Sequence, residues 1–187
     1  MDENLRRMYD DFFGETKLDV KNEREITEEI KTESEIDIDS LLLEDKSIEL
    51  LKKIVDYMKR YSLDEVSNYI TFNVLLNTNN KETINNVITI LTKEDKYLKN
   101  KNNIEFSMFD LEKNSNISGL YDNGLVLFKD LQAFDMKDVE TKNLFLHNFK
   151  NNLSNKSITV LSDEKKNIDS FLTYDNDLTN RFFTFVL

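Results

Sequence analysis

The chain has 187 residues, enough for one domain with a sizeable core, and its formal net charge is −11. It contains no cysteine and one histidine, His147, which disfavours disulfides, zinc centres and Ser-His-Asp catalysis. No apolar run approaches the ~20 residues of a membrane span, and the N-terminus lacks the basic start and apolar core of a signal peptide. We therefore expect a cytoplasmic protein that does not associate with membranes.

The acidic charge lies mainly in the first 50 residues, which contain 17 Asp and Glu against 7 Lys and Arg. The rest of the chain contains 19 against 18 and is close to neutral. A near-neutral domain with an acidic extension is poorly suited to neutralising phosphates, so nucleic acid is not an expected partner. A basic protein partner fits this charge distribution better.

Residues 1–40 are predicted to be an acidic N-terminal extension. A short docking helix is favoured at its start by apolar residues at helical spacing: Leu5, Met8, Tyr9, Phe12 and Phe13. The segment from Asp19 to Asp39 has little to bury and is interpreted as a linker. The alternative is that the whole extension is a disordered acidic tail.

A helix and a strand are predicted next. Asp45 or Ser47 can cap a helix that continues to Arg60. Its apolar stripe is formed by residues at helical spacing: Leu50, Leu51, Ile54, Val55 and Met58. Residues 69–75 are rich in β-branched and aromatic side chains and predict a strand.

The segment after this strand has the layout of a phosphate-binding loop, because a polar stretch and a lysine precede a helix predicted over residues 82–91. In such loops, glycine-freed backbone N–H groups cradle phosphates, a lysine reaches the terminal phosphates and a Ser or Thr hydroxyl meets the metal. Lys81 and Thr83 fit the last two roles, whereas Glu82 would repel an anion. Polar residues replace the glycines: Asn77, Thr78, Asn79 and Asn80. Asparagine tolerates positive φ, but its side chain obstructs a phosphate, and an ordinary strand-to-helix connection is the alternative.

The run from Gly124 to Asp130 is short and apolar, begins after a glycine and is closed by an acid. This pattern is typical of a buried parallel strand that delivers a carboxylate to the carboxyl edge of a sheet. Asp130 is therefore a candidate ligand for a phosphate-bound Mg²⁺. A core strand followed by a solvated aspartate is the alternative.

The remaining segments complete an alternation of strands and helices. Three further strands are predicted: 104–109, 157–161 and 182–187. Two further helices are predicted: 138–153 and 168–172. His147 lies in the first of these helices and is interpreted as a surface or packing residue. Five strands with helices between them predict an α/β domain over residues 41–187, with a doubly wound, parallel five-stranded sheet.

Together, these segments resemble the core of an AAA+ ATPase, and more closely the CbxX/CfqX (SpoVK-like) group. The likeness runs from about Leu41 to Leu187. Residues 67–72 are similar to the strand before the phosphate loop. Residues 77–84 look like a Walker A sequence with its glycines replaced and one residue inserted, and residues 124–130 are similar to the Walker B strand. Three more look like the sensor strand, its following helix and the Arg-bearing segment: 158–162, 168–172 and 176–182.

The chain departs from the family pattern at several places. By resemblance Asp130 would hold Mg²⁺, yet Leu131 stands where the family places the glutamate that orients the attacking water. We expect hydrolysis to suffer, because positioning the nucleophile is central to phosphoryl transfer. The stretch between Phe109 and Gly124 leaves no room for a helix and pore loop, and the chain ends at Leu187, where a helical lid would begin.

By the same resemblance, Arg181 is a candidate trans-acting arginine that would stabilise charge in the active site of a neighbouring subunit. The alternative is a surface arginine that pairs with Asp175 or Asp177, since exposed pairs of this kind are common and weak.

Three functions follow. We favour a catalytically degenerate AAA+-like domain that does not turn over ATP, for which no ATP or Mg²⁺ cofactor is expected, and that acts as a protein-interaction, regulatory or scaffolding module, alongside an active AAA+ partner or as an oligomer. The second is an atypical ATPase of the CbxX/SpoVK type that binds ATP and Mg²⁺ through Lys81, Thr83 and Asp130. The third is a core that only displays the acidic extension to a basic partner.

Overall fold

The computed structural model describes residues 36–61, 72–93, 98, 101–113, 115, 117, 119–120, 124–153, 157–182 and 185–187. Residues 38–187 form one compact unit. The predicted docking helix, most of the predicted linker, and residues 69–71 of the predicted strand lie outside the described residues.

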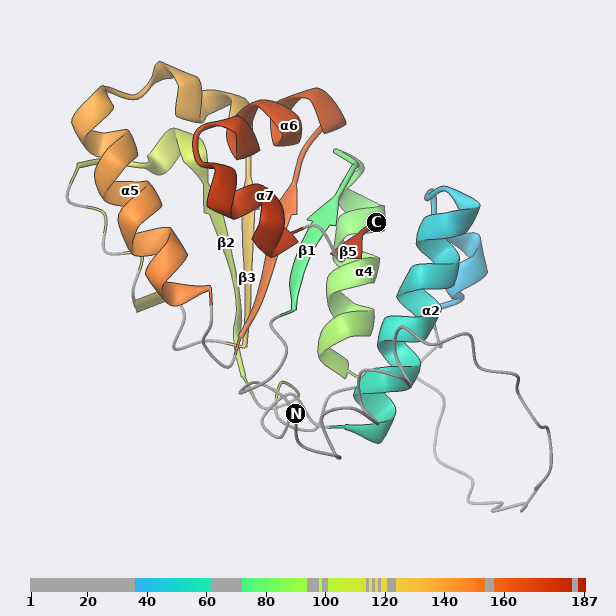
Figure 1. Ribbon diagram of the computed structural model, residues 1–187. Coiled ribbons are helices and arrows are strands. Elements are labelled where there is room, and N and C mark those ends of the chain that lie inside the picture. The colour runs from blue at the N-terminus through green and yellow to red at the C-terminus, as the bar shows by residue number, and fades with distance from the viewer. Residues whose placement is uncertain are drawn as a thin grey trace, which may run out of the picture. The chain divides into compact units, whose positions relative to one another are not determined.

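A parallel sheet forms the centre of this unit (Figure 1). Its strands are β1 (Asn73–Leu76), β2 (Asn103–Ser107), β3 (Leu125–Lys129), β4 (Ile158–Ser162) and the two-residue β5 (Phe185–Val186). They lie side by side in the order β2-β3-β4-β1-β5, and every pairing is parallel. The predicted α/β class with a parallel sheet is confirmed.

Burial along the strands follows their place in the sheet. Every residue of β1 and β4 is buried, and so is β3 up to Phe128, because helices cover both faces of these central strands. Strand β2 lies at an edge and its residues are exposed or half-buried. Gly124 precedes β3 at a point where a Cβ atom would come within 2.5 Å of the Cβ of Lys101, so close backbone approach explains the glycine that opens this run.

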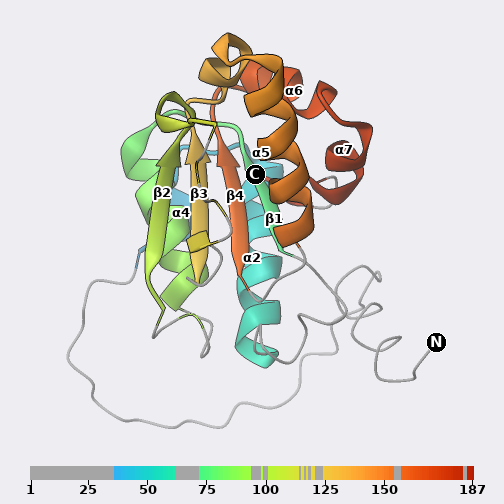
Figure 2. The ribbon, with the colours of Figure 1, turned by 90° about the vertical axis from the view of Figure 1, so that its left-hand side faces the viewer.

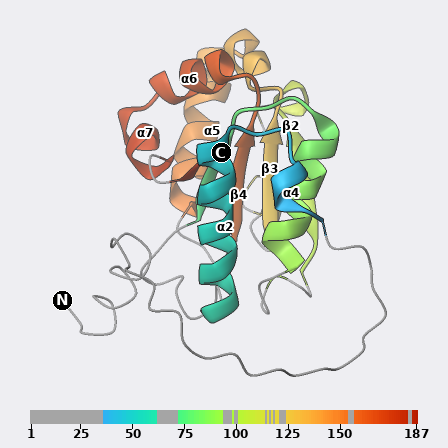
Figure 3. The same cartoon turned by 90° about the vertical axis from the view of Figure 1, so that its right-hand side faces the viewer.

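Helices cover the two faces of the sheet. Helices α2 (Asp45–Arg60) and α4 (Lys81–Lys93) lie on one face (Figure 3), and α5 (Val139–Asn152), α6 (Lys165–Thr173) and α7 (Asn176–Phe182) lie on the other (Figure 2). Three short 3-10 helices, η1 (Ile38–Ser40), η3 (Met108–Asp110) and η5 (Leu131–Met136), complete the described elements. Among these helices, none has both the length and the apolar character needed to cross a membrane.

The predicted last strand over residues 182–187 begins too early. Phe182 is instead the last residue of α7, and pairing with β1 starts at Phe185. The physical reason is the i, i+4 spacing of Leu178 and Phe182, which places both side chains in the core on one helical face. Asp175 supports the start of this helix, because its Oδ1 accepts a hydrogen bond from the backbone N–H of Asp177 at 2.9 Å.

The core between the sheet and α5, α6 and α7 is built largely from phenylalanine. Phe149 lies at its centre and is fully buried, with its ring 5.1 Å from that of Phe128 in an edge-to-face contact. The ring of Phe149 also contacts three other rings, those of Phe145, Phe171 and Phe182. This core holds the carboxyl ends of β3 and β4 and the segments that follow them in fixed positions.

Candidate functional site

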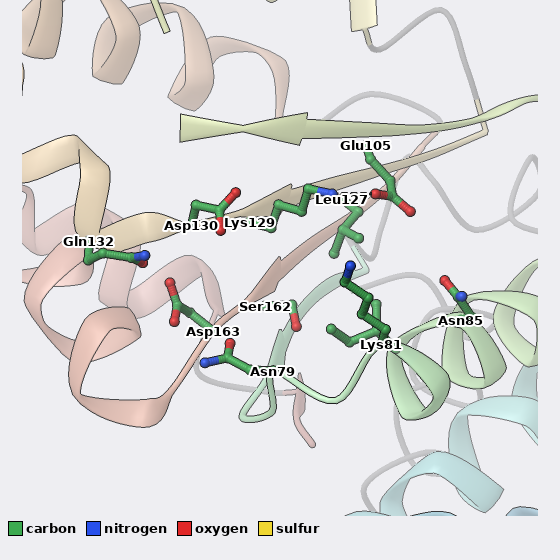
Figure 4. A pocket seen from close by; sticks show the side chains of 11 residues that line it. Asn79, Lys81, Asn85, Glu105, Leu127, Lys129, Asp130, Gln132, Ser162 and Asp163 are labelled. Atoms are coloured by element: carbon green, nitrogen blue, oxygen red, sulfur yellow. Dashed lines mark hydrogen bonds and ion pairs between the residues drawn. The ribbon is translucent and has the colours of Figure 1, made fainter. Parts of the chain in front are cut away.

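A pocket of about 440 Å³ lies at the carboxyl edge of the sheet (Figure 4). The adjacent strands β1 and β4 are followed by helices on opposite faces, α4 on one and α6 on the other. Open parallel sheets bind their ligands in the crevice that such a reversal creates. The described residues that line the pocket come from β2, β3 and β4, from the segments that follow β1, β3 and β4, and from the start of α4: Asn79, Lys81, Ile84, Asn85, Glu105, Leu127, Lys129, Asp130, Gln132, Ser162 and Asp163.

The loop after β1 is closed by its own side chains. The Oδ1 atom of Asn80 accepts a hydrogen bond from the backbone N–H of Thr83 at 2.9 Å, which caps the start of α4. The Oγ1 atom of Thr78 accepts one from the N–H of Asn80 at 3.1 Å. Ser162 ties the loop to β4, because its hydroxyl donates to the carbonyl of Thr78 at 2.9 Å. Two N–H groups that a phosphate would need are thereby engaged within the protein.

The backbone of this loop also lacks the conformation of an anion-binding nest. Such a nest needs successive residues that alternate between right-handed and left-handed conformations, so that their N–H groups converge on one point. Among the described non-glycine residues, only Asp130 has a positive φ, so Asn77, Asn79 and Asn80 all have negative φ. The asparagines that replace glycine therefore do not adopt the conformation that glycine would supply there.

Lys81 and Thr83, the two residues predicted to contact nucleotide and metal, have different surroundings. Lys81 is the first residue of α4, and its side chain extends into the pocket (Figure 4). Thr83 is buried and is not among the described residues that line the pocket. A hydroxyl so placed is not available to a metal ion in the pocket.

Asp130, the predicted metal ligand, lies in the pocket in a strained backbone conformation. Its φ and ψ are 58° and 43°, in the left-handed region that few residues other than glycine occupy. Its Oδ2 atom accepts a hydrogen bond from the hydroxyl of Ser107 at 2.5 Å, which links the ends of β2 and β3. One carboxylate oxygen of Asp130 is thus engaged with a neighbouring strand.

Asp163 is a site residue that the sequence analysis missed. It follows β4 and is almost fully buried, yet three donors satisfy its carboxylate: the N–H groups of Leu131 and Glu164, both at 2.7 Å, and Nδ2 of Asn167 at 2.8 Å. Leu131 stands where the AAA+ family that the sequence resembles places a glutamate. Its side chain is buried, and its backbone N–H donates to Asp163. The sequence signal was the aspartate directly after an apolar strand, the same pattern that pointed to Asp130.

A cross-strand ion pair occupies the side of the pocket next to β2. The Nζ atom of Lys129 lies 2.7 Å from Oε2 of Glu105. The hydrogen bond to Glu105 raises the pKa of Lys129, the charges of Glu105 and Asp130 add to this effect, and partial burial opposes it. Lys129 therefore stays protonated and engaged with Glu105 at neutral pH.

The charged side chains that line the pocket do not favour binding of a polyanion. Its described residues supply two ammonium groups, Lys81 and Lys129, and three carboxylates, Glu105, Asp130 and Asp163. Among the described residues, no group of three or more Asp, Glu, His or Cys side chains could hold a metal ion. A polyphosphate in this pocket would therefore lie near more carboxylates than ammonium groups, beside a loop without an anion-binding nest.

Arg181 lies away from the pocket, on α7. Its side chain is exposed, and its Nη1 atom lies 3.5 Å from the carbonyl of Lys150, a long contact. The predicted alternative partner, Asp175, pairs instead with Lys150, although the nearby Arg181 charge also stabilises this carboxylate. The guanidinium is accessible to another molecule.

Comparison with known proteins gives no match: no protein-family model matches the chain, and neither does a curated protein or a solved structure.

The cap at Asn80 can be tested by comparing two neighbouring asparagines. Asn80→Ala removes the acceptor for the Thr83 N–H, and we expect it to lower the free energy of unfolding by roughly 1 kcal/mol. Asn79 is exposed and makes no hydrogen bond to the described residues, so Asn79→Ala should leave stability nearly unchanged. Urea unfolding of both variants measures the difference, and equal stabilities would contradict the cap.

The Lys150–Asp175 pair predicts a dependence of stability on pH. The hydrogen bond from Lys150 lowers the pKa of Asp175, assisted by the Asp177 N–H and by the Lys150 and Arg181 charges, while burial opposes it. Because the pKa of Asp175 is lower in the folded state, its ionised carboxylate stabilises the fold at pH values above its unfolded-state pKa of about 3.9. This stabilisation is lost as the pH falls through the folded-state pKa.

We therefore expect Asp175→Asn to be less stable than the wild type near neutral pH, with a difference that shrinks below about pH 4. Urea unfolding at about pH 7 and about pH 3 measures both differences. Asp169→Asn, which changes an exposed carboxylate on α6, is the matched control. A difference for Asp175→Asn that stays constant with pH would show that the ionised carboxylate is not its cause.

Proposed function

We propose that residues 38–187 are a catalytically degenerate AAA+-like domain that acts as a protein-interaction or regulatory module and does not turn over ATP. The observation that carries this proposal is the loop after β1. It follows a central strand and precedes a helix that begins with Lys81, as a phosphate loop does, yet it contains no left-handed residue and its own Asn80 caps the helix.

The residues at the end of β3 support the same proposal. Hydrolysis of a phosphoanhydride needs a group that positions or polarises the attacking water. Leu131 follows Asp130 and is buried, with its N–H held by Asp163, so its side chain offers no such group. A domain with these features has lost the means to orient water while it keeps a folded surface for binding.

One observation favours a second candidate, an atypical ATPase. Lys81 and Asp130 are the residues expected to contact phosphate and Mg²⁺, and both line the same pocket. We rank this function second, because Thr83 is buried away from the pocket and one oxygen of Asp130 is bonded to Ser107.

The partner that we propose is a protein. A formal net charge of −11 and its concentration in the N-terminal part of the chain favour a basic partner surface. An active AAA+ protein is a candidate, since the exposed Arg181 is available to a neighbouring subunit, and self-association would present it in the same way. The cytoplasm is the compartment we propose, on the sequence argument alone.

Thermal unfolding with ATP or ADP, with and without Mg²⁺, tests the loss of nucleotide binding. A ligand of the folded state at a hundredfold excess over its Kd adds about 2.7 kcal/mol, which appears as a melting-temperature rise of a few degrees. We expect no rise at millimolar nucleotide, because the groups that would hold the phosphates are engaged within the protein.

The control for this experiment is a pair of lysine variants. Lys81 and Lys165 are both exposed first residues of helices, but only Lys81 lines the pocket. A Mg²⁺-dependent rise that is lost in Lys81→Ala and kept in Lys165→Ala would overturn the proposal and establish the ATPase-type site.

A further inference from the structure

We propose that the pocket at the carboxyl edge of the sheet binds a small aliphatic zwitterion, a molecule with an ammonium group and a carboxylate at opposite ends of a short hydrocarbon chain. The inference goes beyond the proposed function, because it assigns a ligand to a pocket for which that function requires none.

The two ends of the pocket differ in charge. At one end lie the amine of Lys81, the Lys129–Glu105 ion pair and the amide of Asn85 (Figure 4). The lining residues of the other end are two aspartates and two amides: Asp130, Asp163, Gln132 and Asn79. The first end carries one positive charge in sum, and the second carries two negative charges. A ligand that matches both ends needs an anionic and a cationic group.

Each end has one charged group that is available to a ligand. The ammonium of Lys81 has no hydrogen-bond or ion-pair partner among the described residues, whereas that of Lys129 is held by Glu105. At the other end, both oxygens of Asp163 accept N–H groups, whereas Asp130 accepts a hydrogen bond from the described part of the chain only through Oδ2, from Ser107. The ligand carboxylate would therefore pair with Lys81, and its ammonium with Oδ1 of Asp130.

The lining of the pocket also includes two apolar side chains, and Leu127 lies next to the Lys81 amine (Figure 4). Leu127, on β3, and Ile84, on α4, both line the pocket. A hydrocarbon segment of the ligand would lie against them and be removed from water, which is favourable in proportion to the area buried. The volume of about 440 Å³ falls within the range of small-molecule sites, roughly 300–1,000 Å³.

Simpler ligand classes match the pocket at one end only. A monocarboxylate would pair with Lys81 and leave Oδ1 of Asp130 unpaired, whereas a monoamine would pair with Asp130 and leave Lys81 unpaired. Inorganic phosphate and polyphosphates would face three carboxylates and a loop without a nest. Specific sites of this kind discriminate by leaving a charged group unpaired when the wrong ligand binds.

Isothermal titration calorimetry of the full chain with ω-amino acids of increasing chain length tests the inference. The alkylamine and the alkanoate of the same chain length are the probes for each end alone. We expect one ω-amino acid to bind saturably and both single-charge probes to bind at least about tenfold more weakly, because each lacks one charged hydrogen bond.

Two variants test which end of the pocket binds which charged group of the ligand. Lys81→Met should abolish the preference for the ω-amino acid over the alkylamine, and Asp130→Asn the preference over the alkanoate. Asparagine tolerates the left-handed conformation of Asp130, so that variant should keep the loop intact. Lys165→Met and Asp169→Asn make the same charge changes on exposed positions of α6 outside the lining and should bind as the wild type does.

The outcomes separate this inference from the proposed function. Absence of binding by every ω-amino acid, or equal binding of all three probe classes, would overturn the inference and leave the argument about nucleotides untouched. Binding of nucleotide would overturn the proposed function instead, and it is measured in a separate titration.

Discussion

The structure depends most on how the backbone N–H groups at the carboxyl edge of the sheet are satisfied. Parallel strands end at this edge with the first turns of helices exposed, and these groups need acceptors from side chains, water or a ligand. Here side chains supply them: Asn80 accepts from the N–H of Thr83 at the start of α4, and Asp163 accepts from the N–H groups of Leu131 and of Glu164, which precedes α6. Ser107 and Ser162 add cross-links between neighbouring strand ends. Side chains of this edge therefore serve as the acceptors for these backbone N–H groups.

This constraint decides which chemistry the pocket can perform. A phosphate-binding protein leaves the helix start and the loop N–H groups open, so that the anion completes the hydrogen bonding when it binds. In this chain, a phosphate would have to displace the side chain of Asn80, and it would be repelled by three nearby carboxylates. What remains is a mostly polar pocket with opposite charges at its two ends and two apolar side chains in its lining, together with an exposed surface that includes Arg181. These features are the basis of our proposal that the domain acts by binding.

Much of the fold could be predicted from the sequence, because burial imposes simple periodicities. The runs at β3 and β4 and the helical stripe of α2 gave the α/β class and the parallel sheet. Helix α7 was missed because Leu178 and Phe182 are only two apolar positions in a polar segment, too few to define a period. At the site, Lys81 and Asp130 were predicted and line one pocket, but the burial of Thr83 and the role of Asp163 were not predicted. The role of Asp163 depends on a hydrogen bond from the N–H of Leu131, 32 residues away in the sequence, and the burial of Thr83 depends on how α4 packs; local patterns specify neither.

The most direct test of the account is a proton–nitrogen NMR titration of the labelled protein with ATP and Mg²⁺, followed at the backbone amides of residues 77–83 and of Leu131. These groups surround the place where phosphates would lie, and Asn80 and Asp163 occupy two of them. The account predicts that their resonances do not move at millimolar nucleotide. Saturable, Mg²⁺-dependent shifts of the Thr83 and Leu131 amides would contradict it, because they would mean that a phosphate can replace the side chains that close this edge.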